Sequence, residues 1–236
     1  MLEIIASTVE EAILIEKCGA DRIELVSALS EGGLTPSYGL IEHVVKSVSI
    51  PVNVMVRPHS QNFVYSDYSI NCMIKDIEII KQLKANGIVI GVLDKNNNVD
   101  IPVMEKLLKH CKGLEVTFHR AIDECQDILS EVKKITKLNH ISRILTSGGS
   151  GKAIDNLNKI CEINKTLENT NIKILVGSGV TLENFSLIFE KIGLNEIHIG
   201  TNVRENFSSL NSIEEEKLKN FVEKFKDYKK SFYQQS

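Results

Sequence analysis

Short runs of β-branched and other apolar residues recur along the chain, separated by longer stretches with helical periodicity. We expect strands at residues 2–7, 22–26, 52–56, 88–92, 115–119, 143–147, 173–177 and 196–200. The blocks between and after them predict helices near residues 8–19, 35–48, 70–87, 101–112, 124–138, 152–167, 181–193 and 212–231. Thr8 and Gly19 suit the two ends of the first helix, and Gly87 is expected to end the third.

Strict alternation of strand and helix is typical of a parallel sheet. Eight such units in 236 residues predict an α/β fold of the (β/α)8 TIM-barrel type, a single domain over residues 1–236 in which residues 205–236 form a closing helix and tail. An open doubly wound sheet is the alternative. Against it, the first strand-to-helix turn (IIASTVEE, residues 4–11) lacks a glycine-rich dinucleotide fingerprint.

The alternation of side chains along each strand predicts which residues face the barrel centre. On most strands one set of alternating side chains is apolar, and we expect this set to face the surrounding helices. The other set should face the barrel centre and includes Glu3, Glu24, Asn53, Arg57, Glu115, Thr117, His119, Glu196 and His198. Barrel centres are usually filled by Val, Ile and Leu, so this interior is unusually polar. We expect Glu24 to face Arg57, His119 and His198 across the barrel. A purely structural Glu24–Arg57 ion pair is the alternative. Taken by itself, His198 is interpreted as a hydrogen-bonded histidine of the core rather than as a metal ligand.

Two groups of charged residues lie at opposite ends of the strands. Those near strand starts are expected to pair at the bottom of the barrel, where they serve stability: Glu3, Arg22, Glu115, Arg143 and Glu196. Those near strand ends fall where barrel active sites lie, and the densest run is TFHRAID, residues 117–123.

These residues suggest acid–base chemistry on an anion. The catalytic candidates are Glu24, His119 and Asp123, because His119 titrates near neutral pH and Asp123 could orient it or join a charge cluster. Asp123 as a cap of the next helix is the alternative. Arg57, Arg120 and His198 would hold an anionic substrate.

Three glycine-containing strand-to-helix loops are candidates for binding the same anion through backbone N–H groups. Their residues are Ser147, Gly148, Gly149, Gly177, Ser178, Gly179, Gly200 and Thr201. Tight turns that merely require glycine are the alternative. The long loop at residues 57–69 suits a functional or lid-like role, with Ser66 and Asp67 as caps of the helix beyond it.

Composition limits the partners. The net charge of −3 and the isoelectric point near 6.1 give no basic field for nucleic acid or anionic lipid. The first residues enter a strand at once, no apolar run reaches membrane-span length, and five cysteines lie scattered without a CxxC motif. We therefore expect a cytoplasmic protein with reduced thiols and no membrane or nucleic-acid partner.

Six segments together resemble the CutC family, named for copper homeostasis. They are GADRIEL (19–25), EGGLTPSYGLI (31–41), IPVNVMVRP (50–58), FVYSD (63–67), VTFHRAID (116–123) and RILTSGG (143–149), and the resemblance covers about residues 2–204. It implies a cytosolic TIM barrel that forms a dimer or larger homo-oligomer, a link to copper tolerance, and copper as the ligand or cofactor.

The chain departs from the family at two positions where members often carry cysteine, because Val26 and Ile199 stand there. Cu(I) prefers thiolate and thioether ligands, and near the mouth the chain offers only His119, His198, Met55 and Cys125. The residues thus argue against tight copper binding, and no metal ligand set is assigned.

Three functions remain open. The chain could bind or buffer copper, as the resemblance implies. It could be an enzyme of isomerase, epimerase or lyase type that moves a proton on a small phosphorylated or carboxylated metabolite. It could also be a binding module without chemistry.

Overall fold

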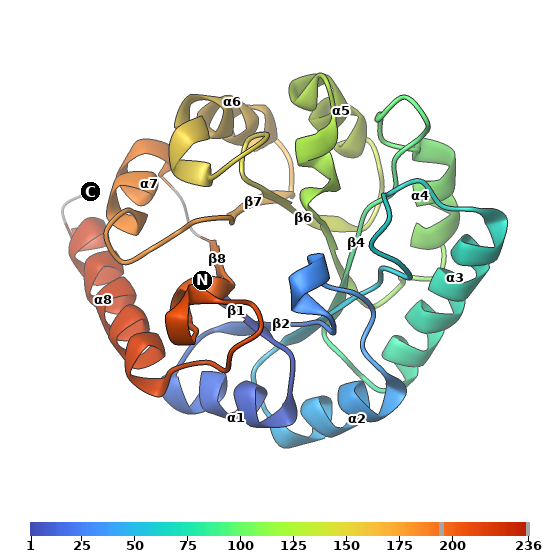
Figure 1. Ribbon diagram of the computed structural model, residues 1–236. Coiled ribbons are helices and arrows are strands. Elements are labelled where there is room, and N and C mark those ends of the chain that lie inside the picture. Colours follow the sequence, from blue (N-terminus) through green and yellow to red (C-terminus); the bar gives the residue numbers. More distant parts are fainter. Residues whose placement is uncertain (194–195, 235–236) are drawn as a thin grey trace.

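The computed structural model describes residues 1–193 and 196–234 and contains a closed barrel of eight parallel strands that follow one another in sequence order (Figure 1). The strands are β1 (Leu2–Ala6), β2 (Arg22–Leu25), β3 (Val52–Met55), β4 (Gly87–Ile90), β5 (Glu115–Phe118), β6 (Ile141–Thr146), β7 (Lys173–Val176) and β8 (Ile197–Ile199). This confirms the predicted (β/α)8 barrel and excludes the open doubly wound sheet.

Within the described residues, eight α-helices surround the barrel: α1 (Val9–Cys18), α2 (Tyr38–Ser47), α3 (Asp67–Gln82), α4 (Ile101–Leu108), α5 (Ile128–Ile135), α6 (Leu157–Leu167), α7 (Phe185–Ile192) and α8 (Glu215–Gln234). Short 3-10 turns connect several strands to the next helix, among them Leu29–Glu31, Arg120–Glu124, Ala153–Asn156 and Thr201–Val203. The predicted closing helix is α8, and residues 235–236 of the predicted tail lie outside the described residues. Among the helices of the described residues, none combines the length and the apolarity needed to span a membrane.

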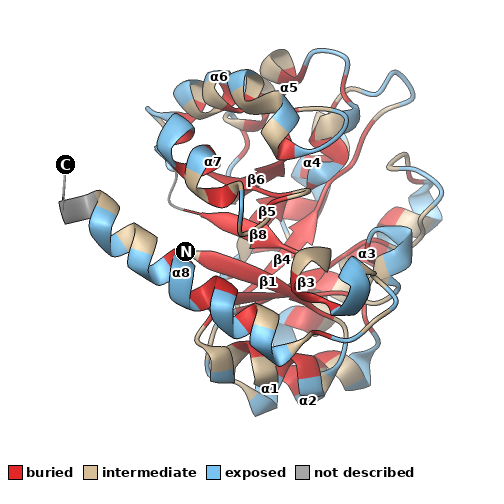
Figure 2. Ribbon diagram, turned by 60° about the vertical axis from the view of Figure 1, so that its left-hand side comes forward, coloured by how far each residue is buried: buried red, intermediate tan, exposed pale blue. Residues whose placement is uncertain are grey.

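The main hydrophobic core lies between the strands and the helices (Figure 2). On β1 the side chains of Leu2, Ile4 and Ala6 belong to it, and on β2 those of Ile23 and Leu25 do. This is the phase that sequence alternation assigned to the helical layer. The other phase fills the barrel centre and is largely polar, as predicted.

Capping residues that can be recognised in the sequence form several of the helix ends. The Thr8 side chain accepts a hydrogen bond from the Glu11 N–H, and Gly19 ends α1 in the left-handed conformation, as expected. Ser66 caps α3, which ends at Gln82. The prediction that Gly87 ends this helix was wrong, because Gly87 begins β4. A Cβ there would stand 2.5 Å from the Glu115 carbonyl oxygen, so glycine is required by close packing inside the barrel.

The five charged residues near the strand starts do pair at the bottom of the barrel, and we call them the floor network: Glu3, Arg22, Glu115, Arg143 and Glu196. Arg22 bonds Glu3 and, at 2.8 Å, Glu196. Arg143 bonds Glu196 at 2.7 Å and Glu115 at 2.6 Å. Alternating signs thus compensate these charges within the cluster.

Candidate functional site

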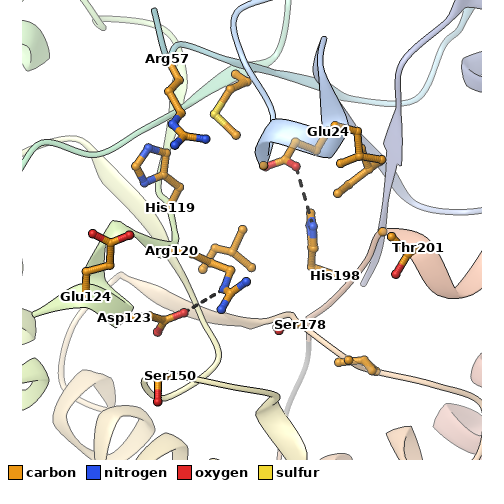
Figure 3. A pocket seen from close by; sticks show the side chains of 18 of the residues that line it. Glu24, Arg57, His119, Arg120, Asp123, Glu124, Ser150, Ser178, His198 and Thr201 are labelled. Carbon is orange, nitrogen blue, oxygen red and sulfur yellow. Dashed lines mark hydrogen bonds and ion pairs between the residues drawn. The ribbon is translucent and has the colours of Figure 1, made fainter. Parts of the chain in front are cut away.

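A cavity of about 470 Å³ opens at the carboxyl ends of the strands (Figure 3). Eleven of the predicted site residues line it, namely Glu24, Arg57, His119, Arg120, Asp123, Gly149, Ser178, Gly179, His198, Gly200 and Thr201. Ser147, Gly148 and Gly177 are not among its lining residues. One wall is apolar, because Ile5, Leu29 and Met55 line the cavity and pack with Val26 and Val89 in the barrel centre. The cavity therefore joins a polar site to a small hydrophobic wall, as small-molecule sites commonly do.

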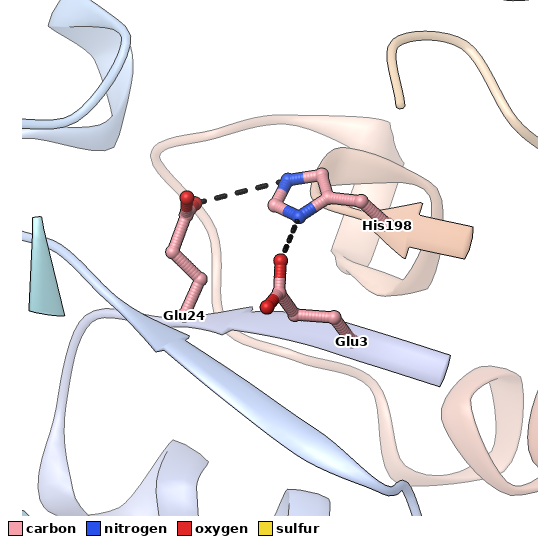
Figure 4. Close-up of side chains that lie close together, drawn as sticks. All are labelled: Glu3, Glu24 and His198. Carbon is pink, nitrogen blue, oxygen red and sulfur yellow. Dashed lines mark hydrogen bonds and ion pairs between the residues drawn. The ribbon is translucent and has the colours of Figure 1, made fainter. Parts of the chain in front are cut away.

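Glu24 faces His198 rather than Arg57 (Figure 4). His198 Nε2 lies 3.8 Å from Glu24 Oε2, while His198 Nδ1 lies 2.8 Å from Glu3 Oε1. All three side chains are buried, and Glu24 Oε1 has no hydrogen-bond partner. The structure thus holds a carboxylate–imidazole–carboxylate series in which one carboxyl oxygen is left for a ligand.

Burial and charge set the three pKa values apart. Burial raises the pKa of Glu24 to about 7, against the opposing attraction of His198 and with the help of the nearby Glu3 charge. Burial would also raise the pKa of Glu3, but Arg22 and His198 outweigh it and lower that pKa to about 2. Burial would lower the pKa of His198, yet Glu24 and Glu3 outweigh it and raise the pKa above its usual value. At neutral pH Glu3 is therefore anionic and accepts the Nδ1–H of His198.

Glu3 is a site residue that sequence reasoning missed, because it was expected to face the barrel centre but to pair only at the floor. It occupies both places, with one oxygen on Arg22 and the other on His198. The signal for this is the register of β1 and β8, which sets Glu3 directly beside His198. The alternation of side chains indicated that both face the centre but not that they are neighbours.

Arg57 and His119 lie side by side across the cavity from Glu24 (Figure 3). The Arg57 guanidinium bonds three main-chain oxygens, those of Glu31 at 2.9 Å, Gly33 at 3.3 Å and Ser60 at 3.3 Å. Phe63, from the long loop after β3, covers both side chains. Its ring centroid is 4.7 Å from Arg57 Cζ and 4.9 Å from the centroid of the His119 ring. The Glu24–Arg57 ion pair considered from the sequence is not formed.

His119 is held in one tautomer. Its Nδ1 accepts a hydrogen bond from the Ala121 N–H at 3.2 Å, so the ring proton is on Nε2. Burial, with the Arg57 charge, lowers the pKa of His119 to about 3. His119 is therefore a neutral hydrogen-bond donor at physiological pH, which makes Glu24 and His198 better suited than His119 to exchange protons.

Asp123 binds neither His119 nor the following helix. It accepts hydrogen bonds from Arg120 Nε at 2.9 Å, from Ser147 Oγ at 2.8 Å and from the hydroxyl of Thr146. The cap of α5 is Asp127, so the capping interpretation of Asp123 was wrong. Arg120 and Asp123 instead form a charge cluster at the mouth, and the Arg120 charge is already matched there.

The three glycine-containing loops divide into two kinds. The amides of Ser147, Gly148 and Gly177 donate to Asp123, to the Thr146 hydroxyl and to the Thr146 carbonyl respectively, so they are occupied within the protein. Gly149, Ser178, Gly179, Gly200 and Thr201 line the cavity and remain the candidates from these loops.

The donor atoms around the cavity do not form a set that fits Cu(I), because the Met55 thioether is the one sulfur among the described residues that line it. Val26 and Ile199, at the positions where cysteine would stand, are buried in apolar clusters. Cys125 is buried against the Ala121 carbonyl, burial raises its pKa to about 12, and it is not a lining residue. Of the residues described, the only gathering of three or more His, Cys, Asp or Glu ligand atoms within 4.8 Å is Glu3, Glu24 and His198, which offers no sulfur.

Comparison with known proteins supports the resemblance found in the sequence. A model of the CutC family matches residues 1–203. A protein from Pasteurella multocida described as family protein CutC is 38% identical over 198 residues, covering 84% of this chain and 80% of that protein. A similarly described protein from Aliivibrio fischeri is 43% identical over 183 residues, covering 77% and 73%.

Solved structures agree with this. The crystal structure of a protein from Streptococcus agalactiae described as CutC aligns with a TM-score of 0.80 at 33% identity, covering 86% of this chain and 98% of that one. A phosphoribosyl anthranilate isomerase from Thermococcus kodakaraensis aligns with a TM-score of 0.65 at 14% identity, covering 95% and 97%. The second likeness shows a shared fold only.

Proposed function

The chain belongs to the CutC family, and we propose that within it this protein is an enzyme that moves a proton on a small carboxylated or phosphorylated metabolite. One observation carries the proposal. Glu24 lines an open cavity and has a buried carboxyl oxygen without a hydrogen-bond partner, and it lies beside a histidine that is itself held by a second carboxylate. In a structural ion pair Glu24 would hydrogen-bond a guanidinium, as Glu3 and Glu196 do at the floor, and no such bond is formed.

The roles follow from the pKa values. Glu24, whose pKa burial raises to about 7, is half ionised near neutral pH and can accept a proton from a substrate carbon or hydroxyl. His198, whose pKa the two carboxylates raise against the effect of burial, can donate one from Nε2. Glu3 orients His198 and stabilises its charged form without taking the proton, because its own pKa is about 2.

Deuterium incorporation tests the proposal without knowledge of the substrate. Mixtures of small carboxylic acids and phosphate esters are incubated with the protein in deuterium oxide, and mass spectrometry detects compounds that gain deuterium. We expect exchange in at least one compound, with a rate that rises with pH through about 7. Glu24→Gln should slow exchange by roughly 10²- to 10⁴-fold.

The matched control is Glu42→Gln, the same substitution on the outer surface of α2. It should exchange as fast as the unchanged protein. Absence of exchange in every compound, or equal rates for Glu24→Gln and Glu42→Gln, would contradict the proposal.

Copper binding, which the family name suggests, has a separate test. None of the described residues that line the cavity is a cysteine, so we expect no stoichiometric uptake in equilibrium dialysis with Cu(I) under reducing conditions. Uptake of one ion per chain that is lost in Glu24→Gln would favour a copper-binding role over proton transfer.

A further inference from the structure

The side of the cavity across from Glu24 holds a buried cation without a counter-charge. Arg57 is only 7% exposed, and within residues 1–193 and 196–234 no carboxylate forms an ion pair with it. Its partners are main-chain oxygens, and its Nε has none. The adjacent Tyr65 does not supply a charge, because burial raises its pKa to about 12. A buried charge of this kind is costly unless an anion joins it, so Arg57 is incomplete without a ligand.

A second unused donor lies next to it. Because His119 Nδ1 accepts the Ala121 N–H, the ring proton is on Nε2, and Nε2 is buried with no partner. Both side chains line the cavity and both lie under the Phe63 ring, which shields them from water. Hydrogen bonds formed in such a shielded place are stronger than those made in solvent.

We infer that Arg57 and His119 form a seat for a carboxylate group of the substrate, in which Arg57 Nε–H and His119 Nε2–H donate to its two oxygens. The inference rests on the proposed function and narrows its substrates from carboxylated or phosphorylated metabolites to carboxylated ones. A carboxylate held here places the rest of a small molecule toward Glu24 and His198, on the other side of the same cavity (Figure 3).

The unpartnered nitrogens suit a carboxylate better than a phosphate. Both terminal nitrogens of Arg57 have main-chain partners, namely the carbonyls of Glu31, Gly33 and Ser60, so Arg57 Nε and His119 Nε2 are the two nitrogens here without any partner. A planar carboxylate has two oxygens and matches them. A phosphoryl group carries a charge of about −1.5 to −2 near neutral pH, which the single charge of Arg57 would not balance in this buried place.

Oxalate, a small planar dicarboxylate, is the probe, and oxamide is its neutral counterpart of similar shape. Isothermal titration calorimetry of the unchanged protein should show saturable binding of oxalate and at least tenfold weaker binding of oxamide. Inorganic phosphate should bind more weakly than oxalate. No saturable binding of oxalate, or equal affinity for oxalate and oxamide, would overturn the inference.

Two variants locate the binding. Arg57→Lys keeps the positive charge but loses the Nε–H, and it should weaken oxalate binding about tenfold to hundredfold. His119→Asn retains an oxygen that can accept the Ala121 N–H but loses the Nε2 donor, and it should weaken binding about tenfold. The second variant keeps the test decisive if Arg57→Lys fails to fold.

Lys152→Gln is the control for simply removing a positive charge near the cavity. This exposed lysine packs on Gly179 at the rim and does not line the cavity. It should bind oxalate within about twofold of the unchanged protein. Equal weakening by Lys152→Gln and Arg57→Lys, or unchanged binding in both seat variants, would refute the seat.

Failure of the seat and failure of the proposed function are distinguishable. Oxalate binding needs no turnover, and Glu24→Gln should retain it because Glu24 lies on the opposite side. Oxalate binding without deuterium exchange would leave a carboxylate-binding protein and end the enzyme proposal. Exchange with a phosphate ester, in a protein that does not bind oxalate, would end the carboxylate seat alone.

Discussion

The floor and the mouth of this barrel contain the same kinds of side chain, but their charges are compensated differently. At the floor, Arg22 and Arg143 each bond two carboxylates. At the mouth, Glu24 Oε1, Arg57 Nε and His119 Nε2 are buried without hydrogen-bond partners. A paired group stabilises the fold, whereas an unpaired one costs free energy that a ligand can recover. Glu196 Oε1 at the floor also lacks a hydrogen-bond partner, but the same carboxylate bonds two guanidinium groups through Oε2. The comparison therefore contrasts a network of paired charges at the floor with charged groups at the mouth that form no such network.

Glu3 connects the two regions. Its bond to Arg22 belongs to the floor network, and its bond to His198 belongs to the mouth. Arg22 holds the pKa of Glu3 low against the effect of burial, and the anionic Glu3 in turn raises the pKa of His198. The floor thus sets the charge state of the site above it.

The largest effect is expected at the floor. Arg22→Met leaves the carboxylates of Glu3 and Glu196 without the guanidinium they share, and should lower the free energy of unfolding by about 3 to 5 kcal/mol. Urea denaturation measures it. Lys17→Met, which breaks the exposed pair with Glu215, is the control and should change little. Similar midpoints for the two variants would show that the floor pairs do not hold the barrel together.

The pH dependence of stability should have opposite signs at the two ends. The pKa of Glu3 is about 2, below the ordinary 4.5, so its contribution is present above pH 4.5 and is lost as pH falls toward 2. The pKa of Glu24 is raised to about 7, so its contribution is present below pH 4.5 and is lost as pH rises to 7 and beyond.

Glu24→Gln removes the second effect. At pH 8 this variant should be more stable than the unchanged protein by on the order of 2 to 3 kcal/mol, and near pH 4.5 the two should be alike. His198 also makes the protein less stable as the pH rises. In Glu24→Gln this contribution becomes smaller too, because His198 loses a carboxylate partner. Thermal denaturation from pH 4.5 to 8 measures the difference. A parallel fall in both proteins would place the titrating group elsewhere.

The smallest effects are expected for alanine substitutions at two neighbouring glycines, Gly87 at the start of β4 and Gly91 directly after it. A Cβ at Gly87, toward the floor, would stand 2.5 Å from the Glu115 carbonyl oxygen, which belongs to a barrel strand. A Cβ at Gly91, toward the mouth, would stand 2.5 Å from two atoms of the His119 ring. We expect Gly87→Ala to cost about 1 to 3 kcal/mol of stability with oxalate binding preserved in the folded fraction.

Gly91→Ala should affect oxalate binding more than stability, because the His119 side chain can move away from the new methyl group, whereas a strand backbone cannot. Its stability should fall by less than that of Gly87→Ala, while its affinity for oxalate falls about tenfold as Nε2 leaves the seat. Denaturation and calorimetry on the same two preparations give both quantities. Equal losses of stability and of affinity in the two variants would remove the distinction between floor and mouth.

The sequence by itself determined the eight strand–helix units, the polar phase of the barrel centre and the gathering of Glu24, Arg57, His119 and His198 around one cavity. These features depend on periodicity and on strand ends, which are local. Only the tertiary structure decided which of these groups touch. Closure of the barrel fixes the register between strands far apart in sequence, and it set Glu3 beside His198. The same closure turned Glu24 toward His198 and left Arg57 without a carboxylate, so partner choice, unlike facing direction, could not be obtained from the order of residues.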